Sequence, residues 1–182
     1  ELSGDILIEQ DCHNIDVVNW FMGKHPVKVS GYGSRQLRQY GNVYDNLYQM
    51  ASKDKEEQKA NEYFEEAKKY YTQATEKDPK NVDAVYSLGA LYYNKAAVRT
   101  QEMNALPDDF SSAGLKKLKA MKDEVMGLFE LALPHFQKAE SLDPNDMNTL
   151  IALNEIYARK EDELSIEFKK RLDTVKEGGK NA

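Results

Sequence analysis

The sequence has little cysteine and no long apolar run. Its 182 residues contain one cysteine, Cys12, which excludes an internal disulfide and a zinc site made of several cysteines. No apolar run approaches the roughly 18 residues that a membrane-spanning helix needs. No basic region followed by an apolar core marks a signal peptide. We expect a cytoplasmic protein by default, with the periplasm as the alternative because the chain begins at Glu1 rather than Met.

An excess of basic residues is also missing. The formal net charge is -6, and 31% of the residues are charged. Nucleic acids and anionic membranes attract basic surfaces, so this balance argues against both as partners. The mean hydropathy of -0.73 suits thin layers of helices with much exposed surface.

The common chemical motifs are absent as well. The sequence has no Walker loop, no G-x-S-x-G segment and no calcium-binding EF-hand spacing. Its three histidines, His13, His25 and His135, are far apart and form no H-x-x-x-H pair. We therefore expect no metal, no cofactor and no catalysis.

Two apolar patterns recur between residues 37 and 157. The first has spacing 0, 3, 4, 7 and the second has spacing 0, 4, 7, 12, so each pattern marks one face of a helix. The first pattern comprises Leu37, Tyr40, Gly41 and Tyr44, then Val85, Leu88, Gly89 and Tyr92, then Leu150, Leu153, Asn154 and Tyr157. The second comprises Ala67, Tyr71, Ala74 and Pro79, then Ala132, Phe136, Ala139 and Pro144. The third repeat ends with a plain apolar stripe of Leu164, Phe168, Leu172 and Val175.

These patterns resemble the tetratricopeptide repeat (TPR) over residues 37 to 175. Pro79 and Pro144 are 65 residues apart, and so are Leu88 and Leu153. One TPR period of about 34 residues plus an insertion of roughly 31 accounts for both offsets. The resemblance implies a mainly α domain over 37–176, in which antiparallel helical hairpins form a short right-handed solenoid. Residues 177–182 read as a disordered tail.

The insertion predicts one extended hairpin. Its first helix should run to Met103, the chain should turn over 106–112, and Ser111 or Ser112 should cap the second helix. A continuous core stripe should then run along Leu115, Leu118, Met121, Val125, Phe129, Ala132, Phe136 and Ala139. Pro134 should bend this helix locally. We expect Leu106 and Phe110 to be exposed at the tip as an interaction surface; a structural spacer, self-packing and self-association through the hairpin are alternatives.

The first 36 residues differ from the rest. Residues 6–10 and 27–33 are typical of strands, and residues 12–23 are typical of a short helix, which predicts a small N-terminal α/β fragment. Residues 1 to about 44 resemble the C-terminal domain of the glucose-fructose oxidoreductase and inositol dehydrogenase family (Gfo/Idh/MocA). By this resemblance Glu9, His13 and Asp16 match the acidic, histidine and aspartate positions of the sugar-binding and catalytic wall.

The parts that such an oxidoreductase needs are missing from this sequence. There is no strand followed by G-x-G-x-x-G and a helix to hold a dinucleotide, and the Glu-Lys-Pro segment with the family's catalytic lysine is absent. Glu9, His13 and Asp16 are therefore vestigial candidates. The chain reads as a composite, or fused sequence, joined near residues 40–46, which suit both resemblances.

We predict a TPR scaffold that binds a peptide or a partner protein without catalysis. The alternative is a fragment of an NAD(P)-dependent sugar oxidoreductase without its dinucleotide-binding domain, and a structural periplasmic scaffold is a third possibility. Candidate partner-binding residues lie on the first helix of each repeat or at the hairpin tip: Asn42, Asn46, Tyr86, Asn94, Leu106, Phe110, Asn148 and Asn154.

Overall fold

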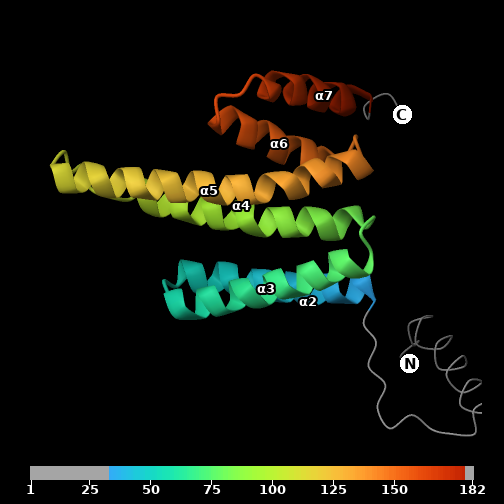
Figure 1. The fold of residues 1–182 in the computed structure, drawn as a ribbon, viewed down its shortest axis with the longest axis horizontal. Helices are drawn as coiled ribbons and strands as arrows, with labels where there is room; N and C mark the ends of the chain where they lie inside the picture. The colour runs from blue at the N-terminus through green and yellow to red at the C-terminus, as the bar shows by residue number, and fades with distance from the viewer. Residues whose placement is uncertain (1–32, 179–182) are drawn as a thin grey trace, which may run out of the picture. The chain divides into compact units, whose positions relative to one another are not determined.

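The computed structural model describes residues 33–178, which contain six helices and no strand (Figure 1). They are α2 (Ser34–Lys53), α3 (Glu57–Lys77), α4 (Val82–Asn104), α5 (Ser112–Leu142), α6 (Met147–Arg159) and α7 (Leu164–Gly178). The prediction of a mainly helical chain is confirmed for this range. The predicted strands and helix before Gly33, with Glu9, His13 and Asp16, lie outside the described residues, as does the predicted tail beyond Gly178. Helix α7 continues two residues past the expected end at Lys176.

Consecutive helices pack as three hairpins, α2 with α3, α4 with α5, and α6 with α7 (Figure 1). Two of the turns have the same design. Lys55 and Glu161 adopt a left-handed backbone, with φ of 58° and 55°. In each turn an N–H returns to a carbonyl five residues earlier, from Glu56 to Ala51 and from Asp162 to Tyr157. This pattern ends a helix and reverses the chain without glycine.

Helices α4, α5 and α6 each begin with a side-chain cap. Asn81 accepts a hydrogen bond from the backbone N–H of Ala84 at 3.0 Å and so caps α4. Ser111, rather than Ser112, caps α5. Asp146 caps α6 by accepting from the N–H of Thr149. Of the two serines that the sequence offered as caps of α5, the structure uses Ser111.

Glycine allows close approach within two hairpins. A Cβ atom added to Gly41 would lie 2.5 Å from the ring of Tyr71, and one added to Gly89 would lie 3.1 Å from the ring of Phe136. The core also continues between hairpins, because α3 packs on α4 and α5 packs on α6. Its fully buried large side chains are Tyr71, Val85, Leu91, Phe129, Phe136, Leu150, Leu153 and Ile156.

The second hairpin is the longest, as predicted, but its core stripe ends early. Leu115 is 52% exposed, so the expectation that it lies in the core is wrong. The ion pair joins Arg99 of α4 to Glu124 of α5, and Leu115 lies nine residues further along α5 toward the loop. Helix α4 has already ended there, at Asn104, so no helix covers Leu115. Pro134 lies inside α5, which continues on both sides of it.

Candidate functional site

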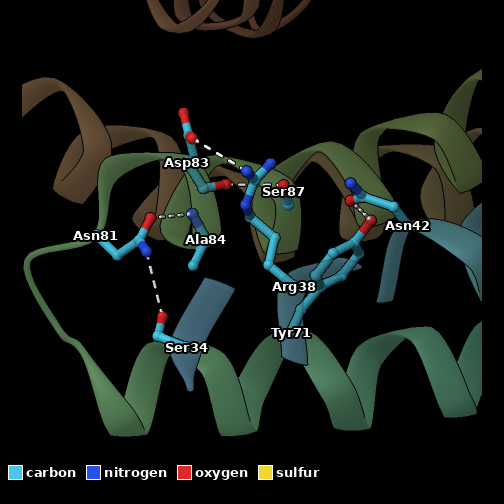
Figure 2. A network of polar contacts seen from close by, with 8 residues as sticks. All are labelled: Ser34, Arg38, Asn42, Tyr71, Asn81, Asp83, Ala84 and Ser87. Carbon is cyan, nitrogen blue, oxygen red and sulfur yellow. Dashed lines mark hydrogen bonds and ion pairs between the residues drawn. The ribbon is translucent and has the colours of Figure 1, made fainter. Parts of the chain in front are cut away.

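The first helices of the three hairpins share one polar face. On α2 and α4, the Arg38 guanidinium lies 3.3 Å from the Asp83 carboxylate (Figure 2). The Arg38 side chain is 25% exposed and that of Asp83 is 71% exposed. Most of the aspartate therefore faces solvent, while the arginine lies along the contact between the two helices. We use the name polar face for the surface of α2, α4 and α6 that carries Arg38, Asn42, Asp45, Asp83, Tyr93, Asn94, Glu155 and Arg159.

Below this ion pair, Asn42 is held by a buried tyrosine. The Tyr71 hydroxyl of α3 donates a hydrogen bond to the Asn42 side-chain oxygen at 2.8 Å (Figure 2). Tyr71 is only 2% exposed, and its burial raises its pKa, with the negative charge of Asp45 adding to the shift. The phenol stays protonated at neutral pH and fixes the orientation of the Asn42 amide.

A second chain of hydrogen bonds fixes the start of α4 on α2. The Asn81 amide donates to the Ser34 hydroxyl at 3.2 Å, and that hydroxyl donates to the backbone carbonyl of Ala74 at 2.9 Å. Asn81 thus caps α4 and also ties it to the neighbouring hairpin (Figure 2). Contacts among α2, α3 and α4 therefore fix the end of the polar face that lies near Asn81.

Asp45 joins α2 and α4 further along the face. The Gln49 amide donates to its carboxylate at 3.2 Å, and the Asn94 side chain of α4 also hydrogen-bonds it. Burial nevertheless dominates and raises the pKa of Asp45. A charged group is thus retained at a partly buried contact, at some cost to the free energy of folding.

The polar face continues from α4 to α6. The Tyr93 hydroxyl donates a hydrogen bond to the Glu155 carboxylate. Burial raises the pKa of Tyr93 to about 12, and the hydrogen bond and charge of Glu155 add to this effect. The Arg159 guanidinium lies 5.2 Å from the centre of the Phe129 ring. Polar pairs therefore connect α2 to α4 and α4 to α6.

The structure separates the predicted binding residues into different surroundings. Asn42 and Asn94 lie on the polar face and are engaged in the contacts above. Tyr86 is half-buried, and its ring centre lies 5.4 Å from that of Phe136. Asn46 and Asn148 are exposed.

The remaining predicted residues are Asn154 and the two at the hairpin tip. Asn154 is half-buried and stands in α6 at the pattern position that Gly41 has in α2 and Gly89 has in α4. Phe110 is 83% exposed, as predicted, whereas Leu106 is half-buried. The tip residues come from the α4–α5 loop and therefore form a surface separate from the polar face.

Sequence reasoning did not select the charged members of the polar face. The groups that it missed are Arg38, Asp45, Asp83, Tyr93 and Glu155. Arg38, Asn42 and Asp45 are spaced by four and three residues, which is a helical stripe beside the apolar one. That spacing was a usable signal, but a polar stripe of this kind is usually a solvated face.

A cavity of about 370 Å³ lies where the α2–α3 turn meets α4 and α5. Arg99 on its wall is paired with both Glu102 and Glu124. Lys95 lies 3.9 Å from the centre of the Phe64 ring, and burial lowers the pKa of this lysine. The cavity therefore holds one cation paired within its wall, Arg99, and one cation against an aromatic ring, Lys95.

The described residues also lack two other features. Within residues 33–178, no three His, Cys, Asp or Glu side chains are grouped as a metal site would require. None of the helices in this part of the chain is long and apolar enough to cross a membrane.

No protein-family model matches this chain, and a search of curated proteins finds no significant match. The geometry of the polar face is therefore the basis for its interpretation.

Proposed function

We propose that residues 33–178 are a tetratricopeptide-like solenoid, right-handed as the resemblance implies, that binds an extended segment of a partner protein along the polar face. The proposal involves neither a catalytic step nor a cofactor. The observation that carries it is the continuity of the polar face across α2, α4 and α6 through the pairs Arg38–Asp83, Asn94–Asp45 and Tyr93–Glu155. Side chains already oriented by such contacts can exchange hydrogen bonds with a ligand at low entropic cost.

The equivalent burial of repeated positions supports the tetratricopeptide part of the proposal. Gly41 contacts Tyr71, and Gly89 contacts Phe136, so the same small-to-aromatic contact occurs in two hairpins. The small residues of the second pattern are fully buried in both, at Ala67, Ala74, Ala132 and Ala139. Equivalent positions of the two hairpins therefore play the same packing role, as expected of a repeat protein.

The charges of the face indicate what kind of segment it would take. Arg38 and Arg159 contribute two positive charges, and Asp45, Asp83 and Glu155 contribute three carboxylates. Arg38 is paired with Asp83, and the Glu155 carboxylate accepts a hydrogen bond from Tyr93. We therefore expect recognition by hydrogen bonds and apolar contact rather than by a cluster of basic groups that holds a carboxylate.

A selected peptide and two alanine-to-arginine variants test this proposal. Ala90 is half-buried in α4 between Tyr86 and Tyr93, so Ala90→Arg would place a long cation in the middle of the polar face. Ala120 is exposed on α5, and Ala120→Arg is the matched control. Peptides are first enriched from a random phage-displayed library on the unchanged chain, and their dissociation constants are then measured by fluorescence anisotropy.

We expect Ala90→Arg to weaken binding at least about tenfold, as burying an unpaired charge in an interface does. Ala120→Arg should bind like the unchanged chain. Failure to enrich any peptide, or equal affinity for both variants, would overturn the proposal. The Phe110→Ser variant locates the alternative surface, because loss of binding in that variant alone would move the site to the hairpin tip.

A further inference from the structure

The cavity beside the α2–α3 turn has charges that balance in total but are unevenly grouped. Its wall carries three cations and three carboxylates, which are Lys55, Lys95, Arg99, Glu57, Glu102 and Glu124. An ion of either sign therefore gains little from the wall as a whole. The grouping of these charges instead decides where the positive and negative ends of a ligand would lie.

The first group is the ammonium of Lys95. It lies 3.9 Å from the centre of the Phe64 ring, and no ion pair joins it to a carboxylate among residues 33–178. The ring favours the charged form, whereas burial disfavours it and lowers the pKa of Lys95. Glu65 attracts this ammonium from α3, but its carboxylate is itself bound to Lys68 at 3.1 Å. A carboxylate inside the cavity would therefore give Lys95 an ion-pair partner.

The second group has one negative charge in excess. The Arg99 guanidinium lies 2.6 Å from the Glu102 carboxylate and 2.9 Å from that of Glu124. Two carboxylates thus share one cation. Lys95 and Arg99 are four residues apart on α4, so they lie on the same side of the helix and about 6 Å apart along its axis. An ammonium placed beside this cluster would restore its charge balance.

Apolar surface is present in the same cavity. Ala60 of α3 and Val98 of α4 belong to its wall, as does Tyr48, whose side chain is buried and hydrogen-bonds Ser52. The volume of about 370 Å³ is within the range of pockets that hold small molecules. A short methylene chain between two charged ends could therefore lie against this apolar part of the wall.

We propose that the cavity binds a small zwitterion whose carboxylate pairs with Lys95 and whose ammonium pairs with the carboxylates of Glu102 and Glu124. The two charges of this ligand should be about one helical turn apart, roughly 6 Å. An ω-amino acid with a short methylene chain provides that separation, whereas an α-amino acid does not. The site is independent of the proposed peptide-binding function, because no residue of the polar face lines the cavity.

Four probes test the charge pattern on the full chain: δ-aminovalerate, valerate, pentylamine and glycine. Valerate lacks the ammonium, pentylamine lacks the carboxylate, and glycine has both charges too close together. Titrations are followed in amide NMR spectra of the isotopically labelled chain, at the backbone N–H groups of Ser52, Ala60 and Val98. We expect a millimolar dissociation constant for δ-aminovalerate, as suits so small a ligand. The other three probes should bind at least about tenfold more weakly, because each leaves a charged group without its partner.

Variants of the wall test which side chains hold each end of the probe. Lys95→Met keeps an unbranched side chain without the charge and should weaken δ-aminovalerate binding at least about tenfold. Lys169→Met on α7 removes an exposed lysine outside the cavity and should leave it unchanged. Lys95→Arg keeps the cation and should bind within a few-fold of the unchanged chain, which separates loss of charge from loss of fold. In Glu102→Gln the Arg99 cluster becomes neutral, so δ-aminovalerate should bind no more tightly than valerate.

Three results would overturn the proposal. They are the absence of δ-aminovalerate binding, equal affinity for δ-aminovalerate and valerate in the unchanged chain, and equal affinity of the Lys95→Met and unchanged chains for δ-aminovalerate. Failure of this proposal is distinguishable from failure of the proposed function. Lys95→Met should leave the affinity for a selected peptide unchanged, and Ala90→Arg should leave δ-aminovalerate binding unchanged.

Discussion

Replacing Gly41 with alanine tests how closely α2 approaches α3. An alanine Cβ at this position would lie 2.5 Å from both Cδ1 and Cε1 of Tyr71, well inside van der Waals contact. The tyrosine ring is 2% exposed, and its hydroxyl donates to Asn42 at 2.8 Å. The ring therefore cannot turn toward solvent, and either the hydrogen bond or the spacing of the helices has to change.

Three effects determine how much the Gly41→Ala substitution changes the free energy of unfolding. Alanine is favoured over glycine inside a helix by about 1 kcal/mol. Overpacking a filled core costs about 1–3 kcal/mol, and weakening the hydrogen bond from Tyr71 to Asn42 costs about 1 kcal/mol. The Gly41→Ala variant should therefore lose about 1–3 kcal/mol of unfolding free energy.

Two other glycines provide the controls. At Gly127 in α5 an added Cβ meets no atom within 4 Å, so Gly127→Ala should keep the full helical gain of about 1 kcal/mol. At Gly89 the added Cβ lies 3.1 Å from Phe136 and 3.2 Å from His135, so the gain and the strain should nearly cancel. The predicted order of stability is Gly127→Ala, then Gly89→Ala, then Gly41→Ala.

Urea unfolding followed by circular dichroism at the helical band measures these differences. The dependence of the unfolding free energy on urea should be the same in all variants, because each exposes the same surface on unfolding. If Gly41→Ala were as stabilising as Gly127→Ala, the close approach of α2 to Tyr71 would be refuted.

Two further predictions concern the contacts between α2 and α4. Asn81→Ala should lower the unfolding free energy by about 1–2 kcal/mol, measured by urea denaturation, because it removes the bond to the N–H of Ala84 and the bond to Ser34. Asp45→Asn should raise stability at pH 7, because burial raises the pKa of Asp45 and so disfavours its ionised form in the folded chain. Thermal melts across pH should show this gain shrinking as pH falls below the ordinary aspartate pKa of 3.8, because the carboxyl then becomes protonated in both states.

The predictions for Asn81→Ala and Asp45→Asn each have a control. Ser111→Ala removes the cap of α5, which is exposed and bonds only within its own turn, so we expect a smaller loss than for Asn81→Ala. Equal losses would show that the bond from Asn81 to Ser34 adds nothing. For Asp45, a stability difference between aspartate and asparagine that did not change with pH would mean that ionisation is not its cause.

The sequence by itself determined the helices and their pairing. Apolar positions at helical spacing predicted every helix after residue 37, because burying one face of a helix requires that spacing. Asn81 was identifiable as a cap because a short polar side chain before a periodic segment satisfies its first N–H groups. The sequence also placed Gly41 and Gly89 at the same position of one pattern, and the structure shows a close helix contact at both.

Only the tertiary structure decided which polar residues meet. Arg38 and Asp83 are 45 positions apart, and Tyr93 and Glu155 are 62 apart. Spacing within one helix carries no information about such pairs, because they depend on the register between hairpins. The same reason explains the error at Leu115, whose periodicity is that of a core residue although α4 ends before reaching it. Periodicity shows which face of a helix is apolar, but the length and placement of the neighbouring helix decide whether that face is covered.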